Sequence, residues 1–230
     1  MRVTLGRMKK KKGGRSGKRR PKRKKAATVT IKDLMMAIDK GKQTKKTILA
    51  GARKIIRDEG VDHLSIARLA DEVGMSTGAV MYHFKNKRAL HKALLEEYAD
   101  HLIHQYVAYE AMFDGSSTET FVPGYVEWFK DFDKNDRGWA VVGIALLSHF
   151  YYDEEIIAPV KNWYKTVYAR IAAMPEEKRI QTLLVIMALE GFFASHKLGL
   201  DMIDPELKAQ TWQYITEKYL PSDAKKKTKK

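Results

Sequence analysis

The chain has 230 residues, no cysteine and a formal net charge of +15. Its length allows one large domain or two smaller ones with a hydrophobic core, and the lack of cysteine excludes disulfide bonds and thiolate metal sites. The longest strongly apolar runs, 139–147 and 183–194, are shorter than the roughly 18 residues that a membrane-spanning helix needs. The first residues lack the apolar segment of a secretory signal, so we expect a cytoplasmic protein without membrane contact.

The positive charge is concentrated at the two ends of the chain. Residues 1–25 contain 14 Lys or Arg and no acid, residues 225–230 contain five Lys, and the sequence between them has a net charge of −4. Within that sequence, residues 44–88 carry a net +4 and residues 89–224 a net −9. This division predicts that the basic part binds a polyanion and that the larger acidic part does not touch it.

The basic ends lack the apolar residues that a folded segment requires. We therefore expect a basic, mostly disordered arm over residues 1–43 and a basic tail over residues 222–230. The arm could follow DNA phosphates, with an affinity that depends on salt and not on sequence. It could equally be a solubilising extension or a start-codon artefact, and a nuclear-localisation signal is a weaker alternative. A brief amphipathic pattern at 30–42 could add one or two helical turns.

Residues 64–87 have the pattern of two short helices joined by a tight turn. Ser65 and Ser76 are suitable N-caps for the two helices, and Gly74 can adopt the left-handed conformation that ends the first one. The second helix is too short to be stable unless it packs against a neighbour. This pattern is typical of a DNA-binding helix-turn-helix, whose second helix enters the major groove.

Other predicted helices flank this segment on both sides. An apolar stripe between Thr44, a suitable N-cap, and Gly60 predicts the first helix of a three-helix DNA-binding domain over residues 44–90. No alternating strand pattern of useful length follows, so we predict an all-α chain with a second helical domain over residues 91–221. The helix that begins at Trp139 is apolar on almost all sides, and we expect other helices to enclose it. The helices expected after the helix-turn-helix are 86–112, 121–132, 139–152, 153–171, 175–198 and 205–220.

The helix-turn-helix segment resembles the recognition segment of the TetR family of bacterial transcriptional repressors. The family's segment reads glycine, an apolar residue, Ser-x-Gly-x-aliphatic-aromatic, and then His-Phe-x-(Ser/Asn)-Lys, and the match here covers about residues 44–95. The resemblance implies an N-terminal DNA-binding domain, a C-terminal effector-binding and dimerisation domain, and neither enzyme activity nor a cofactor. The residues that carry it are Gly74, Met75, Ser76, Thr77, Gly78, Ala79, Val80, Met81, Tyr82, His83, Phe84, Lys85, Asn86 and Lys87.

The resemblance also assigns roles at the DNA. In the family the recognition helix contacts bases and phosphates, and residues on its two flanks hold phosphates. Met81 stands where most members have a tyrosine, and because Met cannot donate a hydrogen bond, one phosphate contact would be lost or moved, with contact to a thymine methyl as a replacement. His83 could instead cap its own helix. The candidate DNA-binding residues are Ser65, Ser76, Thr77, Ala79, Met81, Tyr82, His83 and Lys87.

Candidate effector-binding residues lie in the C-terminal domain. Most are aromatic residues on one helix face, although such a stripe is more often hydrophobic core. His149 and His196 lack the carboxylate spacing of a metal site, so we expect no metal and two buried, hydrogen-bonded histidines. The acidic residues 153–155 are expected to form a solvated helix start. The candidates for effector binding are Tyr125, Trp128, Phe129, Phe132, His149 and Trp163.

Two functions fit this sequence. The first is a homodimeric repressor that binds palindromic double-stranded DNA, pairs through helices 175–198 and 205–220, and leaves the DNA when an unknown small molecule binds. The alternative is a sequence-indifferent DNA-binding or compacting protein driven by its basic ends. We do not expect an enzyme, because the sequence contains no glycine-rich phosphate loop, metal-ligand motif or nucleophile elbow. We expect a cytoplasmic, nucleoid-associated protein.

Overall fold

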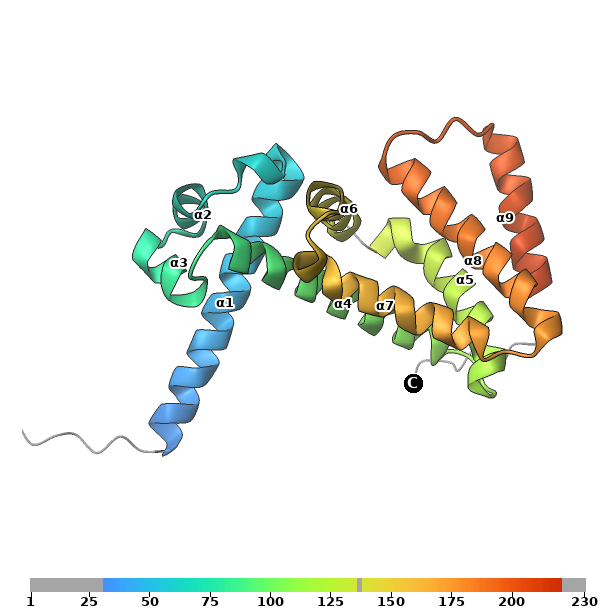
Figure 1. Ribbon diagram of the computed structural model, residues 1–230, viewed down its shortest axis with the longest axis horizontal. Helices are drawn as coiled ribbons and strands as arrows, with labels where there is room; N and C mark the ends of the chain where they lie inside the picture. The colour runs from blue at the N-terminus through green and yellow to red at the C-terminus, as the bar shows by residue number, and fades with distance from the viewer. Residues whose placement is uncertain (1–30, 136–137, 221–230) are drawn as a thin grey trace, which may run out of the picture. The chain divides into compact units, whose positions relative to one another are not determined.

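The computed structural model describes residues 31–135 and 138–220. All regular structure of these residues is helical, which confirms the all-α prediction (Figure 1). No helix among them is long and apolar enough to cross a membrane. Most of the predicted basic arm and the whole predicted basic tail lie outside the described residues. The helices are α1 (Ile31–Glu59), the 3₁₀ helix η1 (Val61–His63), α2 (Ile66–Val73), α3 (Thr77–His83), α4 (Lys87–Glu110), α5 (Ser117–Asn135), α6 (Trp139–Phe150), α7 (Glu154–Ala172), α8 (Glu176–Lys197) and α9 (Pro205–Tyr219).

The first helix begins earlier than predicted. α1 starts at Ile31, so the predicted N-cap at Thr44 was wrong and Thr44 lies inside the helix. A helix gains one hydrogen bond for each residue that it adds, and no proline lies between these two positions to stop it. The chain divides into two units, residues 1–40 and 41–230, and all contacts described below lie within the second unit.

A small hydrophobic core joins α1 to the helix-turn-helix. At Gly51 the helices α1 and α2 approach so closely that an added Cβ would lie 2.4 Å from Cγ1 of Val73. Glycine at this position therefore allows α2 to pack directly on α1. The buried residues of this core are Ile48, Leu49, Ala52, Ile55, Ile56, Leu64, Leu69, Val80 and Phe84.

The long helix α4 connects the helix-turn-helix to the rest of the chain and packs along α5 and α7 (Figure 1). Near its C-terminal end, Tyr106 is buried among aromatic residues. Its ring centroid lies 5.5–6.0 Å from the centroids of four rings in α5 and α7, those of Phe121, Tyr125, Trp128 and Trp163. The aromatic stripe of α5 therefore forms the core between these three helices.

Most of the later helix boundaries agree with the sequence pattern. The side chains of Asn86, Asp153 and Asp204 cap the helices that follow them, and these helices begin within one residue of the predicted starts at 86, 153 and 205. Pro159 lies inside α7, which starts before it at Glu154. The aspartate caps and the loop residues around them are local signals, so these boundaries could be read from the sequence.

The predicted enclosure of the helix at Trp139 was wrong. α6 buries one face, which includes Val142 and Leu146, while Val141 on another face is 42% exposed. α6 contacts α4, α7, α8 and η1, and these neighbours cover only part of its circumference. The exposed residues of α6 are Val141, Ser148 and His149.

Candidate DNA interface and effector site

The turn of the helix-turn-helix has the predicted local geometry. The Ser65 hydroxyl accepts a hydrogen bond from the backbone N–H of Arg68 at 3.1 Å, and the Ser76 hydroxyl accepts one from Ala79 at 3.1 Å. Gly74 between them has φ 64° and ψ 35°, the left-handed conformation that ends α2. The three predicted signals for this turn are confirmed.

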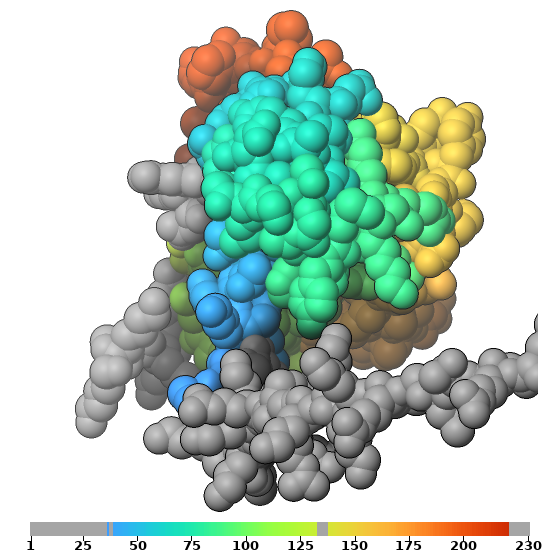
Figure 2. Space-filling model, turned by 90° about the vertical axis from the view of Figure 1, so that its left-hand side faces the viewer, coloured from blue at the N-terminus to red at the C-terminus, as the bar shows by residue number. Residues whose placement is uncertain are grey.

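The candidate DNA-binding residues lie on the outer side of this motif. Tyr82 is 85% exposed and Met81 is 50% exposed, whereas Val80 and Phe84 anchor the opposite side of α3 in the core. Ser65, Ser76 and Thr77 are also exposed, and Ala79, His83 and Lys87 are half-buried. Figure 2 shows the face that η1, α2 and α3 form, in cyan to green. Five of the eight candidates are therefore exposed and three are half-buried, and their contact with DNA stays a prediction.

The chemistry of this face suits a phosphate backbone. Ser65 and Ser76 each accept a bond from a backbone N–H, which leaves the hydroxyl hydrogen available to a phosphate oxygen. The Tyr82 hydroxyl is a further donor, and the Tyr82 ring lies edge-on to His83 with centroids 5.2 Å apart. α3 ends through the backbone N–H of Phe84, which bonds to the carbonyl of Val80.

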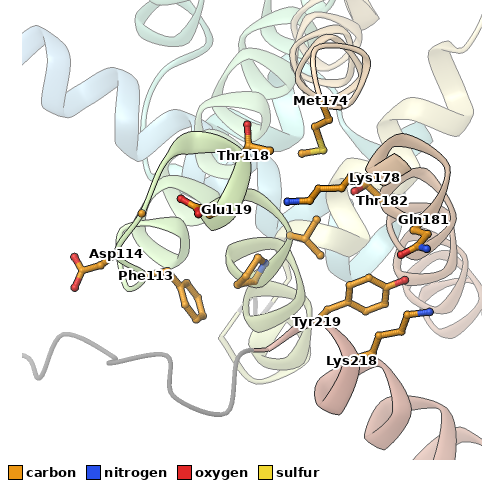
Figure 3. A pocket seen from close by; sticks show the side chains of 13 residues that line it. Phe113, Asp114, Thr118, Glu119, Met174, Lys178, Gln181, Thr182, Lys218 and Tyr219 are labelled. Atoms are coloured by element: carbon orange, nitrogen blue, oxygen red, sulfur yellow. The ribbon is translucent and has the colours of Figure 1, made fainter. Parts of the chain in front are cut away.

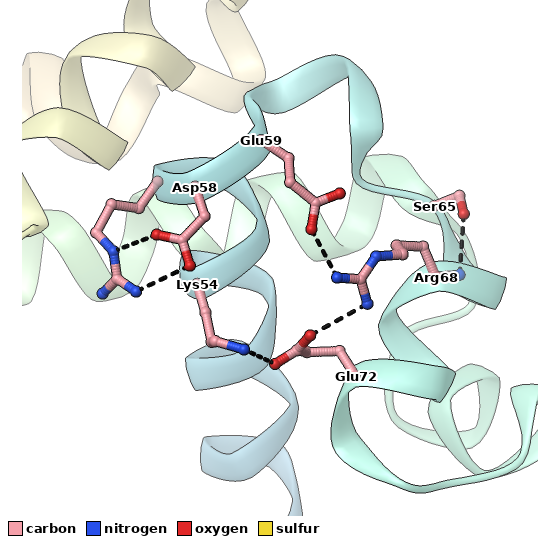
Figure 4. Close-up of polar contacts among 7 residues, drawn as sticks. Lys54, Asp58, Glu59, Ser65, Arg68 and Glu72 are labelled. Atoms are coloured by element: carbon pink, nitrogen blue, oxygen red, sulfur yellow. Dashed lines mark hydrogen bonds and ion pairs between the residues drawn. The ribbon is translucent and has the colours of Figure 1, made fainter.

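Four charged residues hold α2 against α1 (Figure 4). Arg68 lies 2.6 Å from Glu59 and 3.1 Å from Glu72, and Lys54 lies 2.5 Å from the same Glu72. The hydrogen bond from Lys54 holds the pKa of Glu72 below its ordinary value, and Arg68 adds to this effect. These contacts orient α2, and they direct Arg68 toward carboxylates.

One basic residue beside the recognition helix was missed in the sequence. Lys45 in α1 is exposed, and its ammonium lies 5.6 Å from the centroid of the Phe84 ring at the end of α3. It is followed by a second exposed lysine, Lys46. Lys45 could have been predicted from the sequence, because Lys45 and Lys46 form a basic pair just before the apolar stripe of α1.

Charged side chains of α1 and of the first part of α4 contact the rest of the chain. In one set of contacts, which we call the α4–α7 clasp, Arg88 pairs with Asp153 and Glu155 at 2.9 Å each, and Lys92 pairs with Glu155 at 3.0 Å. The predicted solvated acidic helix start is thus partly neutralised by α4. In a second set, Arg53 of α1 pairs with Glu97 of α4 and lies 4.3 Å from the ring centroid of Trp139 in α6.

The structure brings five of the six candidate effector residues together. The ring centroids of Tyr125 and Trp128 are 5.4 Å apart, and those of Trp128 and Trp163 are 6.1 Å apart. Phe129 and Phe132 continue the cluster. All five side chains are at most 8% exposed, so in this conformation they belong to the hydrophobic core, and Trp163 also lines a cavity.

The two histidines predicted to be buried are not. His149 is 39% exposed at its side chain and lies 3.7 Å from Asp62 of η1, away from the aromatic cluster. His196 is 45% exposed and lies 3.5 Å from Asp201. Both residues are in the last turn of their helices, where the surrounding helices no longer cover the side chains.

A cavity of about 290 Å³ lies between α4, α5 and α7. Tyr106, Phe121 and Trp163 form its apolar part, and Glu110 and Arg170 form its polar part. A larger hollow of about 770 Å³ lies between the start of α5, the start of α8 and the end of α9 (Figure 3). Four charged residues, Asp114, Glu119, Lys178 and Lys218, line the larger hollow, whereas most residues that line the smaller cavity are apolar. The smaller cavity is therefore better suited to an apolar molecule.

The polar part of the smaller cavity is a hydrogen-bonded ion pair. Arg170 donates to Glu110 at 2.9 Å and to the Tyr106 hydroxyl at 2.8 Å, and its guanidinium lies 4.5 Å from the ring centroid of Phe121. Burial raises the pKa of Glu110, but hydrogen bonds from Arg170, Tyr106 and Thr120 outweigh burial and hold this pKa below its ordinary value. Glu110 and Arg170 therefore line the cavity as an ion pair in which each charge is neutralised by the other.

Comparisons with known proteins agree with this architecture. Residues 48–94 match the family model described as "Bacterial regulatory proteins, tetR family", and residues 119–218 match "Tetracyclin repressor-like, C-terminal domain". The HTH-type transcriptional repressor Rv1474c of Mycobacterium tuberculosis is 42% identical over 53 residues, which are 23% of this chain and 28% of that protein. The class C tetracycline repressor protein of Escherichia coli is 38% identical over 55 residues, 24% and 25% of the two chains. The match thus spans about a quarter of each of these relatives.

Solved structures share the fold over most of the chain. The putative transcriptional regulator SCO7518 of Streptomyces coelicolor superimposes with a TM-score of 0.59 and 15% identity over 78% of this chain and 99% of that one. The multidrug binding protein EbrR complexed with ethidium gives a TM-score of 0.56 and 18% identity over 74% and 97% of the two chains. At these identities the likeness establishes the fold alone.

The capped turn, the exposed second helix and the all-helical C-terminal half define a helix-turn-helix protein with a second helical domain. The two family matches cover both halves of the chain. The chain belongs to the TetR family of transcriptional regulators, as the sequence motif indicated. The expectation that it is not an enzyme agrees with this membership.

Proposed function

We propose that the chain is a homodimeric transcriptional repressor that binds a palindromic operator and leaves it when a small molecule binds the effector domain. The observation that carries the proposal is the path of one helix. α4 begins at Lys87, four residues after α3 ends, and its far end forms one wall of the 290 Å³ cavity. A molecule in the cavity therefore touches the helix that continues directly from the DNA-contacting motif.

Support for a dimer comes from α8 and α9. Ile180, Leu184 and Met187 follow one another along α8 and are 65%, 63% and 43% exposed, and Leu207 and Tyr214 on α9 are 56% and 59% exposed. An exposed apolar surface of this kind marks an association site. The same stripe continues to Gly191, where an added Cβ would meet no atom within 4 Å, so a partner helix can approach closely. These helices are the pair predicted from the sequence.

The release step uses the contacts at the start of α4. A molecule that binds between α4, α5 and α7 stabilises the conformer in which the spacing of these three helices fits the molecule best. The α4–α7 clasp then transmits a shift of α7 to Arg88, beside the recognition helix. In a dimer this changes the separation of the two recognition helices, and binding to two half-sites about one DNA turn apart is lost.

The names of relatives point the same way. The curated relatives include several transcriptional repressors, and the neighbour EbrR is described in complexes with ethidium and with malachite green. We infer repression and release by a small molecule for this chain from that pattern, together with a location at the nucleoid.

A test separates this function from sequence-indifferent DNA binding. Fluorescence anisotropy would measure binding of the full chain, and of a variant without residues 1–27, to a selected operator and to a scrambled duplex of equal length. A repressor prefers the operator by at least about a thousandfold, and the deletion weakens binding to both duplexes while this ratio stays.

The opposite pattern would refute the repressor. If the full chain binds both duplexes alike, and the deletion removes most binding, the basic arm and not α3 accounts for the affinity. A salt series provides the control, because phosphate contacts made by the arm weaken binding to both duplexes by the same factor as salt rises.

A further inference from the structure

A half-buried carboxylate is hydrogen-bonded to the aromatic core of the effector domain, where no sequence signal placed it. Glu190 of α8 accepts a hydrogen bond from the Tyr125 hydroxyl of α5 at 2.5 Å and from the Tyr164 hydroxyl of α7 at 3.0 Å. Both tyrosine rings are part of aromatic contacts, Tyr125 with Phe129 at 5.0 Å and Tyr164 with Tyr168 at 6.2 Å between centroids. Glu190 is therefore held between three helices and faced by aromatic rings.

Glu190 forms no ion pair with any cationic side chain that the structure describes. Among residues 41–132 and 138–220, no Lys, Arg or His forms an ion pair with Glu190, and its hydrogen-bond partners are the two hydroxyls. Burial raises the pKa of Glu190, and the two tyrosine hydrogen bonds lower it only in part. Buried carboxylates in proteins are normally paired with a cation, because removing a charge from water is costly.

The aromatic rings around Glu190 are suited to a cationic group of a bound molecule. The faces of aromatic rings carry negative charge and attract cations, most strongly where water is excluded. Tyr106 links this region to the cavity, because its ring lines the 290 Å³ cavity and its centroid lies 5.7 Å from that of Tyr125. The rings of Tyr106 and Tyr125 thus stand between a molecule that fills the cavity and the carboxylate.

We propose that Glu190 is the anchor for the cationic group of the effector, and that the effector of this regulator is a compact organic cation with an apolar or aromatic body. In the empty protein the hydroxyls of Tyr125 and Tyr164 occupy the two carboxylate oxygens. Rotation of the Tyr106 and Tyr125 rings opens a path from the cavity to Glu190. The cationic group then binds the Glu190 carboxylate in place of the tyrosine hydroxyls. This assignment rests on the proposed function, since it names the ligand of that same effector domain.

Two probes that differ only in charge test the proposal directly. Phenyltrimethylammonium and tert-butylbenzene have the same shape, and the first carries a positive charge where the second is neutral. Binding to the full chain is followed by tryptophan fluorescence, because Trp128 and Trp163 belong to the same cluster, and by the shift in melting temperature. We expect the cation to bind at least about tenfold more tightly than the neutral probe.

The charge of Glu190 is removed in Glu190→Gln, which keeps the shape of the side chain. This variant should lose the preference for the cation, a change of about tenfold or more, while its affinity for the neutral probe stays. The matched control is Glu177→Gln, which removes an exposed carboxylate from the same helix and should keep the preference. Tyr164→Phe frees one carboxylate oxygen and, measured in alkaline buffer, should tighten cation binding.

Three results would overturn the proposal. They are equal binding of both probes, no binding of the cation at millimolar concentration, and a Glu190→Gln variant that binds the cation as tightly as the original chain. If Glu190→Gln does not unfold cooperatively, a Tyr164→Phe variant with weaker cation binding gives the same negative answer. The probe-binding assay contains no DNA, so a negative result does not affect the DNA-binding proposal. Likewise, a failure of operator binding does not affect a positive result with the cationic probe.

Discussion

The guanidinium of Arg88 lies 2.9 Å from one carboxylate oxygen of Asp153 and 3.0 Å from the other. Arg88 is in the first turn of α4, directly after the recognition helix, and Asp153 caps α7 through the backbone N–H of Ile156. Because α7 also forms a wall of the 290 Å³ cavity, this contact connects that wall to the first turn of α4.

Substitution of Arg88 tests whether the clasp fixes the start of α4. We expect Arg88→Met to lower operator affinity by about fivefold, because the recognition helices then sample more separations. The loss of thermal stability should be small and should vanish at high salt, since the charges are exposed. The control is Lys161→Met, which removes a pair with Glu154 of the same helix and should leave operator affinity unchanged. Equal losses in both variants would contradict a role for the clasp.

Tyr82 and Met81 should divide the DNA contacts between them. Tyr82→Phe removes a hydroxyl that can reach a phosphate, so we expect a loss of about 1 kcal/mol for every DNA sequence. Met81→Ala removes an apolar contact to a base, so it should weaken binding only at particular operator positions. Anisotropy on a panel of single-position operator variants measures both effects. A position-specific loss in Tyr82→Phe would reverse the assignment.

The contact between α4 and α6 depends on a glycine. A Cβ at Gly143 would lie 2.4 Å from the Tyr98 ring, so Gly143→Ala should force the two helices apart and lower the free energy of unfolding by about 1–3 kcal/mol. Gly41→Ala is the matched control, because no atom lies within 4 Å of its added Cβ and it should raise stability by up to about 1 kcal/mol. Urea unfolding of both variants provides the measurement, and a neutral Gly143→Ala would contradict the close packing.

Local signals in the sequence predicted the helices and the turn between α2 and α3, but not the contacts between residues that lie far apart in the sequence. Ser65, Gly74 and Ser76 act within a few residues of their own position, so the turn and the resemblance built on it could be recognised directly. The prediction of an N-cap at Thr44 was wrong because the residues before it also favour a helix. A threonine can cap a helix or lie inside one, so its presence alone does not mark a helix start.

The contacts between distant residues had no such signal. Arg88 and Asp153 are separated by 65 residues, and so are Tyr125 and Glu190. In the sequence, residues 153–155 were indistinguishable from a solvated helix start, and Glu190 lies within the apolar run 183–194. His149 was grouped with the aromatic residues by composition, although the end of α6 places it beside η1. Only the packing of the helices could reveal these pairings.

The buried carboxylate should make stability depend on pH in a particular direction. The pKa of folded Glu190 is raised by burial above the value of about 4.3 for an unfolded glutamate. Folding therefore takes up a proton, and the original chain loses stability as pH rises through the folded pKa. The groups that face Glu190 are Tyr125, Tyr164 and Tyr168, and burial raises the pKa of each of them.

Glu190→Gln removes this dependence. At neutral pH we expect the variant to be more stable than the original chain by about 1–3 kcal/mol, with the difference shrinking to near zero below about pH 4.3. Thermal unfolding of both chains across this pH range gives the comparison. A variant that is less stable at neutral pH would mean that the carboxylate is stabilised there by a contact that Gln cannot make.

The apolar surface of α8 should hold two copies of the chain together. Leu184→Arg places a charge in the middle of this surface, where Leu184 is 63% exposed, and we expect a monomer in sedimentation velocity and loss of binding to a two-half-site operator. Tyr152→Arg, at an 84% exposed residue outside α8 and α9, should remain a dimer. If Leu184→Arg also stays a dimer, the interface lies elsewhere.

Selection of bound sequences from random duplex DNA tests the central claim most directly, because it reports specificity, symmetry and half-site spacing in one measurement. At physiological salt and without effector, the full chain should enrich an inverted repeat whose half-sites are about one helical turn of 10–10.5 base pairs apart. Recovery of sequences without a shared motif, or of a single half-site without its symmetric partner, would contradict a homodimeric repressor that reads its operator with α3.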